Sequence, residues 1–145
     1  MNRCVKSNWI NEHIYRHKRL SINRLNPKSV VFQAHEKAVT PPNTAVISEQ
    51  NVEELFRIFN KKFPEKLSSL ERFFAAVIND LEIVPVPGEK DSLEEHIRDV
   101  ADRPLIRAAR AARAEIFLTG DKDFLESGIT NPLILTPSRF IKLPY

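Results

Sequence analysis

The order of apolar and polar positions becomes regular at residue 29 and predicts alternating helices and strands from there onward. A first helix begins after Ser29, which is a suitable N-cap residue, and ends before Pro41. The segment Thr44–Ile47 is short, partly β-branched and bounded by turn residues, which indicates a buried strand. Ser48 then caps a second amphipathic helix, and Pro64 ends it.

The remainder of the chain continues this alternation. Ser68–Glu71 reads as a capping box and predicts the start of a third helix, whose buried positions run to Leu81. Further predicted elements are an edge strand at Leu81–Val86, an alanine-rich helix capped by Asp102, strands at Glu115–Thr119 and Leu133–Leu135, and a terminal helix at Ser138–Leu143. Strands separated by helices favour an α/β fold with a parallel central sheet covered on both faces.

The first 24 residues show no such pattern, because Asn, His and Arg interrupt every apolar pair. We expect weak order there, or a short helix around Trp9–Leu20. Residues 1–28 hold seven basic groups against one acidic group, whereas residues 29–145 hold 15 basic and 18 acidic groups. Such a basic arm either contacts a phosphate backbone or is a solvated terminus, and we favour the second. The predicted organisation is an atypical basic segment, 1–24, followed by one folded domain, 25–145.

The amino-acid composition excludes several kinds of functional site. Cys4 is the only cysteine, which excludes a disulfide framework and a thiolate zinc site. Three glycines in 145 residues exclude glycine-rich phosphate-binding and dinucleotide-binding loops. The apolar runs fall short of the roughly 20 residues that cross a bilayer, and no signal-peptide pattern opens the chain. We therefore expect a cytoplasmic protein.

Four aspartates form two pairs at positions where sites develop in α/β folds. Asp99 and Asp102 precede the alanine-rich helix, and Asp121 and Asp123 follow a predicted strand. Strand ends and helix starts meet along one edge of an open sheet, so we expect these carboxylates to gather there. Gathered carboxylates repel one another unless a cation joins them, and oxygen ligands suit Mg²⁺ or Mn²⁺. The pattern predicts a divalent-metal site for phosphodiester chemistry, although each aspartate alone could simply cap a helix.

Other polar groups leave alternatives open. Arginines are plentiful near the aspartates, and they form either a solvated helix face or a contact for RNA phosphates: Arg98, Arg103, Arg107, Arg110 and Arg113. Glu54, judged by its position alone, is a solvated helical residue. A signalling domain that accepts phosphate on Asp121 is disfavoured, because Lys142 lies too near the C-terminus to serve as its lysine.

The chain resembles the PIN domain family, in the branch of toxins from bacterial toxin–antitoxin pairs. The resemblance covers roughly residues 25–145 and rests on four blocks: Ile47-Ser-Glu49 with Glu53-Glu54-Leu55, Asp99 with Asp102-Arg-Pro-Leu-Ile106, Phe117-Leu-Thr-Gly-Asp-Lys-Asp-Phe124, and Leu133-Ile-Leu-Thr-Pro137 with Phe140. The third block, together with Asp102-Arg-Pro104, is the most specific, whereas Glu53-Glu54-Leu55 is weak by itself.

The resemblance implies a three-layer α/β/α fold and Mg²⁺- or Mn²⁺-dependent cleavage of RNA. By position, Glu54, Asp102 and Asp121 would be metal-site carboxylates, and Asp123 would be a further acid of the cluster. Asp99 matches a recurrent position but is a less certain ligand. The implied partners are an RNA substrate, an antitoxin protein and a second copy of the chain in a homodimer.

One part of the family pattern is not recognisable. Its first strand is hydrophobic and ends in Asp-Thr-Asn or Asp-Ser-Asn, and the aspartate should fall near Tyr15. The segment offers only Glu12 as an acid and no apolar strand, so we expect both the central first strand and its ligand to be missing. A frameshift or a misplaced start codon would explain this, and residues 1–24 would then not be the ancestral N-terminus. The alternative function is a catalytically degenerate protein that binds RNA or an antitoxin.

Overall fold

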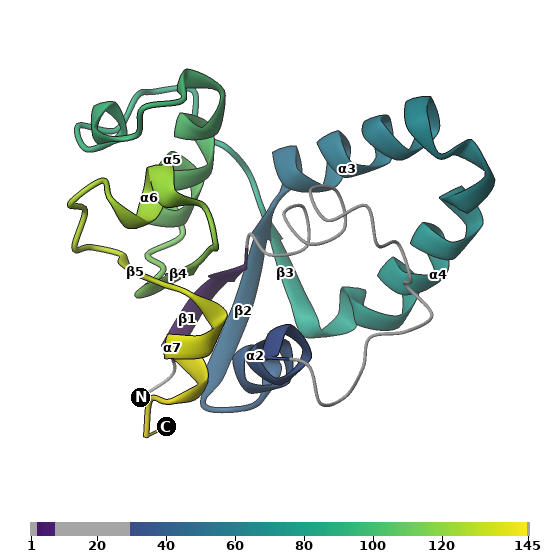
Figure 1. The fold of residues 1–145 in the computed structure, drawn as a ribbon, viewed down its shortest axis with the longest axis horizontal. Helices are drawn as coiled ribbons and strands as arrows, with labels where there is room; N and C mark the ends of the chain where they lie inside the picture. Colours follow the sequence, from purple (N-terminus) through teal and green to yellow (C-terminus); the bar gives the residue numbers. More distant parts are fainter. Residues whose placement is uncertain (1–2, 8–29, 145) are drawn as a thin grey trace.

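A parallel sheet of five strands forms the centre of the fold, with the strand order β3-β2-β1-β4-β5 (Figure 1). The computed structural model describes residues 3–7 and 30–144. The strands are β1 (Arg3–Ser7), β2 (Asn43–Ser48), β3 (Leu81–Val84), β4 (Ile116–Leu118) and β5 (Leu133–Leu135). The predicted α/β class with a parallel sheet is confirmed, and β3 lies at an edge as its neighbouring prolines indicate.

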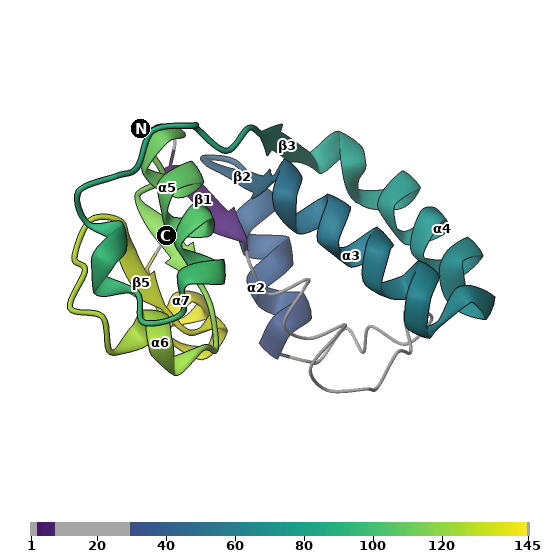
Figure 2. The ribbon, with the colours of Figure 1, turned by 90° about the horizontal axis from the view of Figure 1, so that it is seen from above.

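Helices connect successive strands and cover the sheet (Figures 1 and 2). The α-helices are α2 (Val30–Val39), α3 (Glu49–Lys62), α4 (Leu67–Val77), α5 (Arg103–Ala111), α6 (Lys122–Leu125) and α7 (Pro137–Ile141). Short 3₁₀ turns complete the connections: η3 (Pro64–Lys66), η4 (Ile78–Asp80), η5 (Glu94–His96) and η6 (Val100–Asp102). None of the helices described here is long and apolar enough to cross a membrane.

The two faces of the sheet carry separate hydrophobic cores, which makes the fold three-layered. Successive side chains of a strand point to opposite faces, and β4 shows this directly. Ile116 and Leu118 pack with residues of α2, α3, α4 and α7. Phe117 packs with residues of α5 and α6, among them Ile106 and Phe124. All three β4 residues are buried, so the strand fits the continuous apolar pattern of a sheet covered on both sides.

The expectation that the central first strand is missing is wrong. Arg3–Ser7 forms β1, which pairs in parallel with β2 on one side and β4 on the other. The sequence pattern does not predict this strand, because only Cys4 and Val5 of its five residues are apolar. Two neighbouring strands supply its backbone hydrogen bonds, and this tertiary context overrides the weak local signal. The helix expected around Trp9–Leu20 lies outside the described residues.

The starts of α3 and α4 confirm one predicted helix cap and contradict another. Ser48 caps α3 as predicted, because its hydroxyl accepts a hydrogen bond from the backbone N–H of Asn51 at 3.2 Å. The capping box at Ser68 is wrong: α4 begins at Leu67, and its N-cap residue Lys66 makes no side-chain capping bond. The preceding turn η3 leads straight into α4, so the chain is already helical before Ser68. Leu81 was expected both on the buried side of this helix and at the start of an edge strand, and the structure confirms the strand, since Leu81 begins β3.

Candidate metal centre

The chain leaving β4 places two aspartates at the start of α6. Thr119 is fully buried, and its hydroxyl accepts a hydrogen bond from the backbone N–H of Asp121 at 3.0 Å. The Asp121 carboxylate in turn accepts from the backbone N–H of Asp123 at 2.9 Å, which makes Asp121 the N-cap of α6. The helix-capping interpretation of Asp121 is therefore correct. It does not exclude a second role, because a carboxylate has several acceptor sites.

The third aspartate comes from the turn before α5. Asp99 caps η6 by accepting from the backbone N–H of Ala101 at 2.9 Å, and the Asp102 N–H donates to the Asp99 carbonyl at 3.1 Å. Asp102 precedes α5 as predicted, but its side chain makes no capping bond to that helix. Asp102 is therefore the N-cap residue of α5 by position, as predicted, whereas the capping bond of this region is made by Asp99 to the preceding turn η6. The turn holds the Asp102 carboxylate beside the β4–α6 connection instead.

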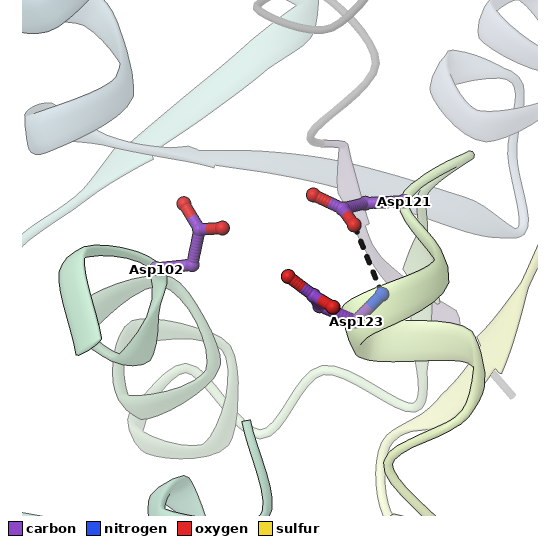
Figure 3. A group of neighbouring side chains, drawn as sticks. All are labelled: Asp102, Asp121 and Asp123. Atoms are coloured by element: carbon purple, nitrogen blue, oxygen red, sulfur yellow. Dashed lines mark hydrogen bonds between the residues drawn. The ribbon is translucent and has the colours of Figure 1, made fainter. Parts of the chain in front are cut away.

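Three carboxylates meet between α5 and α6 (Figure 3). Asp102, Asp121 and Asp123 each offer one oxygen atom, and these atoms all lie within 4.8 Å of one another. Asp121 is buried, and the other two side chains are half-buried. Oxygen ligands of one octahedral Mg²⁺ lie about 3 to 4 Å apart, given ligand distances of about 2.1 Å. The three aspartates therefore offer the oxygen ligands that a small divalent cation binds, and the distances between their oxygen atoms are close to those between its ligands.

The fourth residue carried over by position, Glu54, is not part of this group. Glu54 lies in the second turn of α3, with a side chain that is 41% exposed. One of its oxygens lies 3.9 Å from the Arg57 guanidinium, one helical turn further on. Such an exposed pair adds little stability. A ligand role for Glu54 remains a prediction.

Arg98 adds a positive charge at the rim of the cluster. Its Nη2 lies 3.3 Å from Asp123 Oδ1 and 3.1 Å from Glu126 Oε2. The Arg98 side chain is 70% exposed, so these ion pairs contribute little to folding. They do offset part of the negative charge that the carboxylates bring together.

An ion pair between the buried Glu94 and the half-buried Arg107, which the sequence did not reveal, attaches the segment before the Asp99–Asp102 turn to α5. Arg107 of α5 donates from Nε and Nη2 to the two carboxylate oxygens of Glu94, at 2.7 and 2.8 Å, and from Nη1 to the Pro87 carbonyl at 3.1 Å. Arg110 pairs with Asp91 at 2.8 Å. Both contacts hold the segment between β3 and η6 against α5, and this segment leads into the Asp99–Asp102 turn.

These contacts change the interpretation of the arginines around the aspartates. Arg107 and Arg110 form neither a solvated face nor a free phosphate contact, because each is occupied by an acidic residue of the same chain. The hydrogen bonds from Arg107 hold the pKa of Glu94 below its ordinary value despite burial. Burial alone would raise the pKa of Asp91, but hydrogen bonds from the Leu93 N–H and from Arg110 lower it on balance. No local pattern links Glu94 with Arg107, so only the fold pairs them.

The end of β1 offers a second place for the family's first aspartate, which the sequence pattern put near Tyr15. We counted to Tyr15, but the strand ends at Ser7, and the sequence there reads Lys6-Ser7-Asn8. Ser7 and Asn8 agree with the last two residues of the expected Asp-Ser-Asn pattern, and Lys6 differs from its aspartate. Tyr15 itself lies outside the described residues.

The comparisons with known proteins agree with the geometry of the site. A family model described as PIN domain matches residues 25–123, which contain the three clustered aspartates and Glu54. No curated protein and no solved structure matches the chain.

Proposed function

From the chain's membership of the PIN domain family, a family of metal-dependent nucleases, we propose that it is an endoribonuclease and the toxin of a toxin–antitoxin pair. The observation that carries the proposal is the group of Asp102, Asp121 and Asp123 at the carboxyl side of the central sheet. Carboxylates converge in this way where a cation is held, and sites of open α/β folds lie at this edge.

The three aspartates would hold one or two Mg²⁺ or Mn²⁺ ions, and Glu54 is proposed as a further carboxylate. A bound divalent ion polarises the phosphodiester and lowers the pKa of a bound water molecule. The chain supplies fixed positions for the ligands: Thr119 orients Asp121, Asp121 orients Asp123, and the Asp99 turn orients Asp102. Such anchored ligands lose little entropy when a cation binds.

The partners proposed are an RNA substrate, an antitoxin protein and a second copy of the chain. The family match supports a nucleic-acid substrate, and the resemblance to toxin sequences supports the antitoxin and the homodimer.

Cleavage of a labelled single-stranded RNA with Mn²⁺ or Mg²⁺ tests the proposal. We expect cleavage that EDTA abolishes and that Asp121→Asn reduces by about 10² to 10³-fold, since removing one electrostatic group at a reaction centre has such an effect. Glu71→Gln, which removes an exposed carboxylate from α4, serves as the matched control and should leave cleavage unchanged. Equal cleavage by wild type and Asp121→Asn would contradict the assigned site.

A second function, binding without catalysis, is favoured by one observation. At the end of β1 the sequence Lys6-Ser7-Asn8 has a lysine before the Ser-Asn of the family's Asp-Ser-Asn pattern. A folded protein that binds RNA or an antitoxin but shows no metal-dependent cleavage would support this function over the first.

A further inference from the structure

The arginines around the acid cluster differ in what they contact. Arg107 and Arg110 are half-buried, and each is paired with an acidic residue of the same chain. The Nε of Arg103 donates to a backbone carbonyl at 3.0 Å. Arg113 is exposed but follows the far end of α5. Arg98 differs from all of these, because its exposed guanidinium lies directly beside one of the clustered aspartates.

The backbone on both sides of Arg98 is held in place. Ile97 is fully buried and belongs to the same core as Phe124 of α6. Asp99 caps the turn η6, because its carboxylate accepts a hydrogen bond from the backbone N–H of Ala101 at 2.9 Å. The Arg98 side chain, which is 70% exposed, therefore extends into solvent from a fixed position at the edge of the cluster.

One nitrogen of the Arg98 guanidinium makes both of its contacts. Nη2 lies 3.3 Å from Asp123 Oδ1 and 3.1 Å from Glu126 Oε2. Within residues 3–7 and 30–144, nothing pairs with Nε or Nη1 of this side chain. A guanidinium is a planar fork of N–H donors that matches two oxygens of a phosphate. The other donors of Arg98 are thus available to a phosphate at the rim of the cluster.

We propose that Arg98 binds a phosphate of the RNA strand beside the metal site. This inference rests on the proposed function for its substrate and for the metal site. Asp123 connects the two, because the carboxylate that contacts Arg98 is also a proposed metal ligand, so an RNA strand at that site passes the guanidinium. When Asp123 holds a cation, less of its negative charge is left for Arg98, and the guanidinium pairs with a phosphate instead.

Binding of a fluorescently labelled single-stranded RNA tests this contact apart from cleavage. The measurement uses the full chain with Asp121→Asn, which slows cleavage, at constant Mn²⁺. We expect a further Arg98→Gln to raise the Kd about tenfold, as the loss of a hydrogen bond to a charged group does. The slope of log Kd against log salt concentration should fall by about 0.7, the value for one phosphate contact of a single strand. Arg113→Gln, which removes an exposed arginine at the far end of α5, is the matched control and should change neither quantity.

Steady-state cleavage by the chain with Asp121 intact separates a binding role of Arg98 from a structural one. Arg98→Gln should raise the KM for RNA more than it lowers kcat, because the contact is lost from bound substrate. Arg98→Lys should recover part of the loss, since lysine keeps the charge without the planar fork. The melting temperature of Arg98→Gln should stay close to that of wild type, because ion pairs of so exposed a side chain add little stability.

The outcomes distinguish this inference from the proposed function. Equal RNA binding and equal salt slopes for Arg98→Gln and Arg113→Gln, in a protein that cleaves RNA, would overturn the inference and leave the nuclease intact. Weaker binding by Arg98→Gln alone, in a protein without metal-dependent cleavage, would support the phosphate contact and contradict the nuclease. A folded chain that binds no RNA would overturn the inference.

Discussion

At the scale of single residues, a contact outside the acid cluster holds the segment that leads to one of its aspartates. Glu94 is buried, and both of its oxygens accept hydrogen bonds from Arg107. This contact fixes the segment that leads into the Asp99–Asp102 turn. A buried ion pair need not be more stabilising than an apolar pair of the same shape, but removing one partner leaves an uncompensated charge.

Replacing Glu94 therefore has a large expected effect. Glu94→Gln should lower the free energy of unfolding, because the two hydrogen bonds from the half-buried Arg107 then lose their anionic partner. Urea denaturation measures the loss. The neighbouring Glu95→Gln changes an exposed side chain and should shift stability by less than about 0.5 kcal/mol. Equal effects of the two substitutions would show that the Glu94–Arg107 contact is not the cause.

The same contacts predict a dependence of stability on pH. The pKa of Glu94 and the pKa of Asp91 are both lowered in the folded chain, so folding favours their ionised forms. Their contribution is fully present above about pH 5 and is lost as the pH falls below the ordinary carboxyl pKa toward the lower folded values. The difference in melting temperature between wild type and Glu94→Gln should therefore shrink between pH 7 and pH 3. A constant difference would argue against an ionised Glu94.

Two adjacent glutamates of α3 offer a paired test of the site. Glu54→Gln should reduce RNA cleavage by about 10²-fold if its carboxylate serves the metal site, since that is the usual effect of losing one such group. Glu53 is exposed, and Glu53→Gln should have no effect. Initial rates at saturating Mn²⁺ measure both. Unchanged cleavage in Glu54→Gln would restrict the site to the three clustered aspartates.

At the scale of elements, the starts of α3 and α4 show when a local signal is sufficient. Ser48 and Ser68 both precede amphipathic stretches and both read as caps in the sequence. Ser48 is fully buried at the end of β2 and caps α3, so its strand delivers it in extended conformation to the helix start. Ser68 lies within α4, because the turn η3 has already begun the helix.

The two serines should consequently respond differently to the same substitution. Ser48→Ala should lower the free energy of unfolding by about 1 to 2 kcal/mol, because it removes a buried cap of α3. Ser68→Ala, at an exposed helical position, should be neutral or slightly stabilising, since alanine is the better helix former. Thermal unfolding of both variants measures the difference. A cost at Ser68 as large as that at Ser48 would favour the predicted capping box.

At the scale of the whole molecule, the sheet is continuous only through β1. The strand joins β2 and β3 on one side to β4 and β5 on the other. Its neighbours β2 and β4 carry residues of the two cores: Ala45, Ile47, Ile116, Phe117 and Leu118. The family model matches only from residue 25, so this structural contribution lies outside the matched region.

Deleting residues 1–7 should therefore abolish cooperative folding, whereas deletion of an unpaired terminal segment would leave it unchanged. The deletion removes the hydrogen-bond partner of two strands and exposes the inner edges of both. Loss of a cooperative thermal transition and aggregation in size-exclusion chromatography are the expected results. Removing residues 144–145, which include the exposed Pro144, should leave the transition unchanged and serves as the control. A cooperative transition in the N-terminal deletion would contradict the role of β1.

The sequence by itself determined those features whose physical cause lies within one element or one turn. Apolar periodicity predicted the helices and strands from residue 30 onward, and Ser48 predicted the start of α3. The two aspartate pairs predicted the edge of the sheet where Asp102, Asp121 and Asp123 meet. These signals are local, because helix caps and side-chain periodicity act over a few residues.

Only the tertiary structure decided the features that depend on distant partners. Arg3–Ser7 is the central strand because β2 and β4 both pair with it, although its composition does not predict a strand. The tertiary structure also paired Glu94 of η5 with Arg107 of α5. A weak segment and a lone charge acquire their roles from the groups packed around them, and the linear sequence does not show which groups those are.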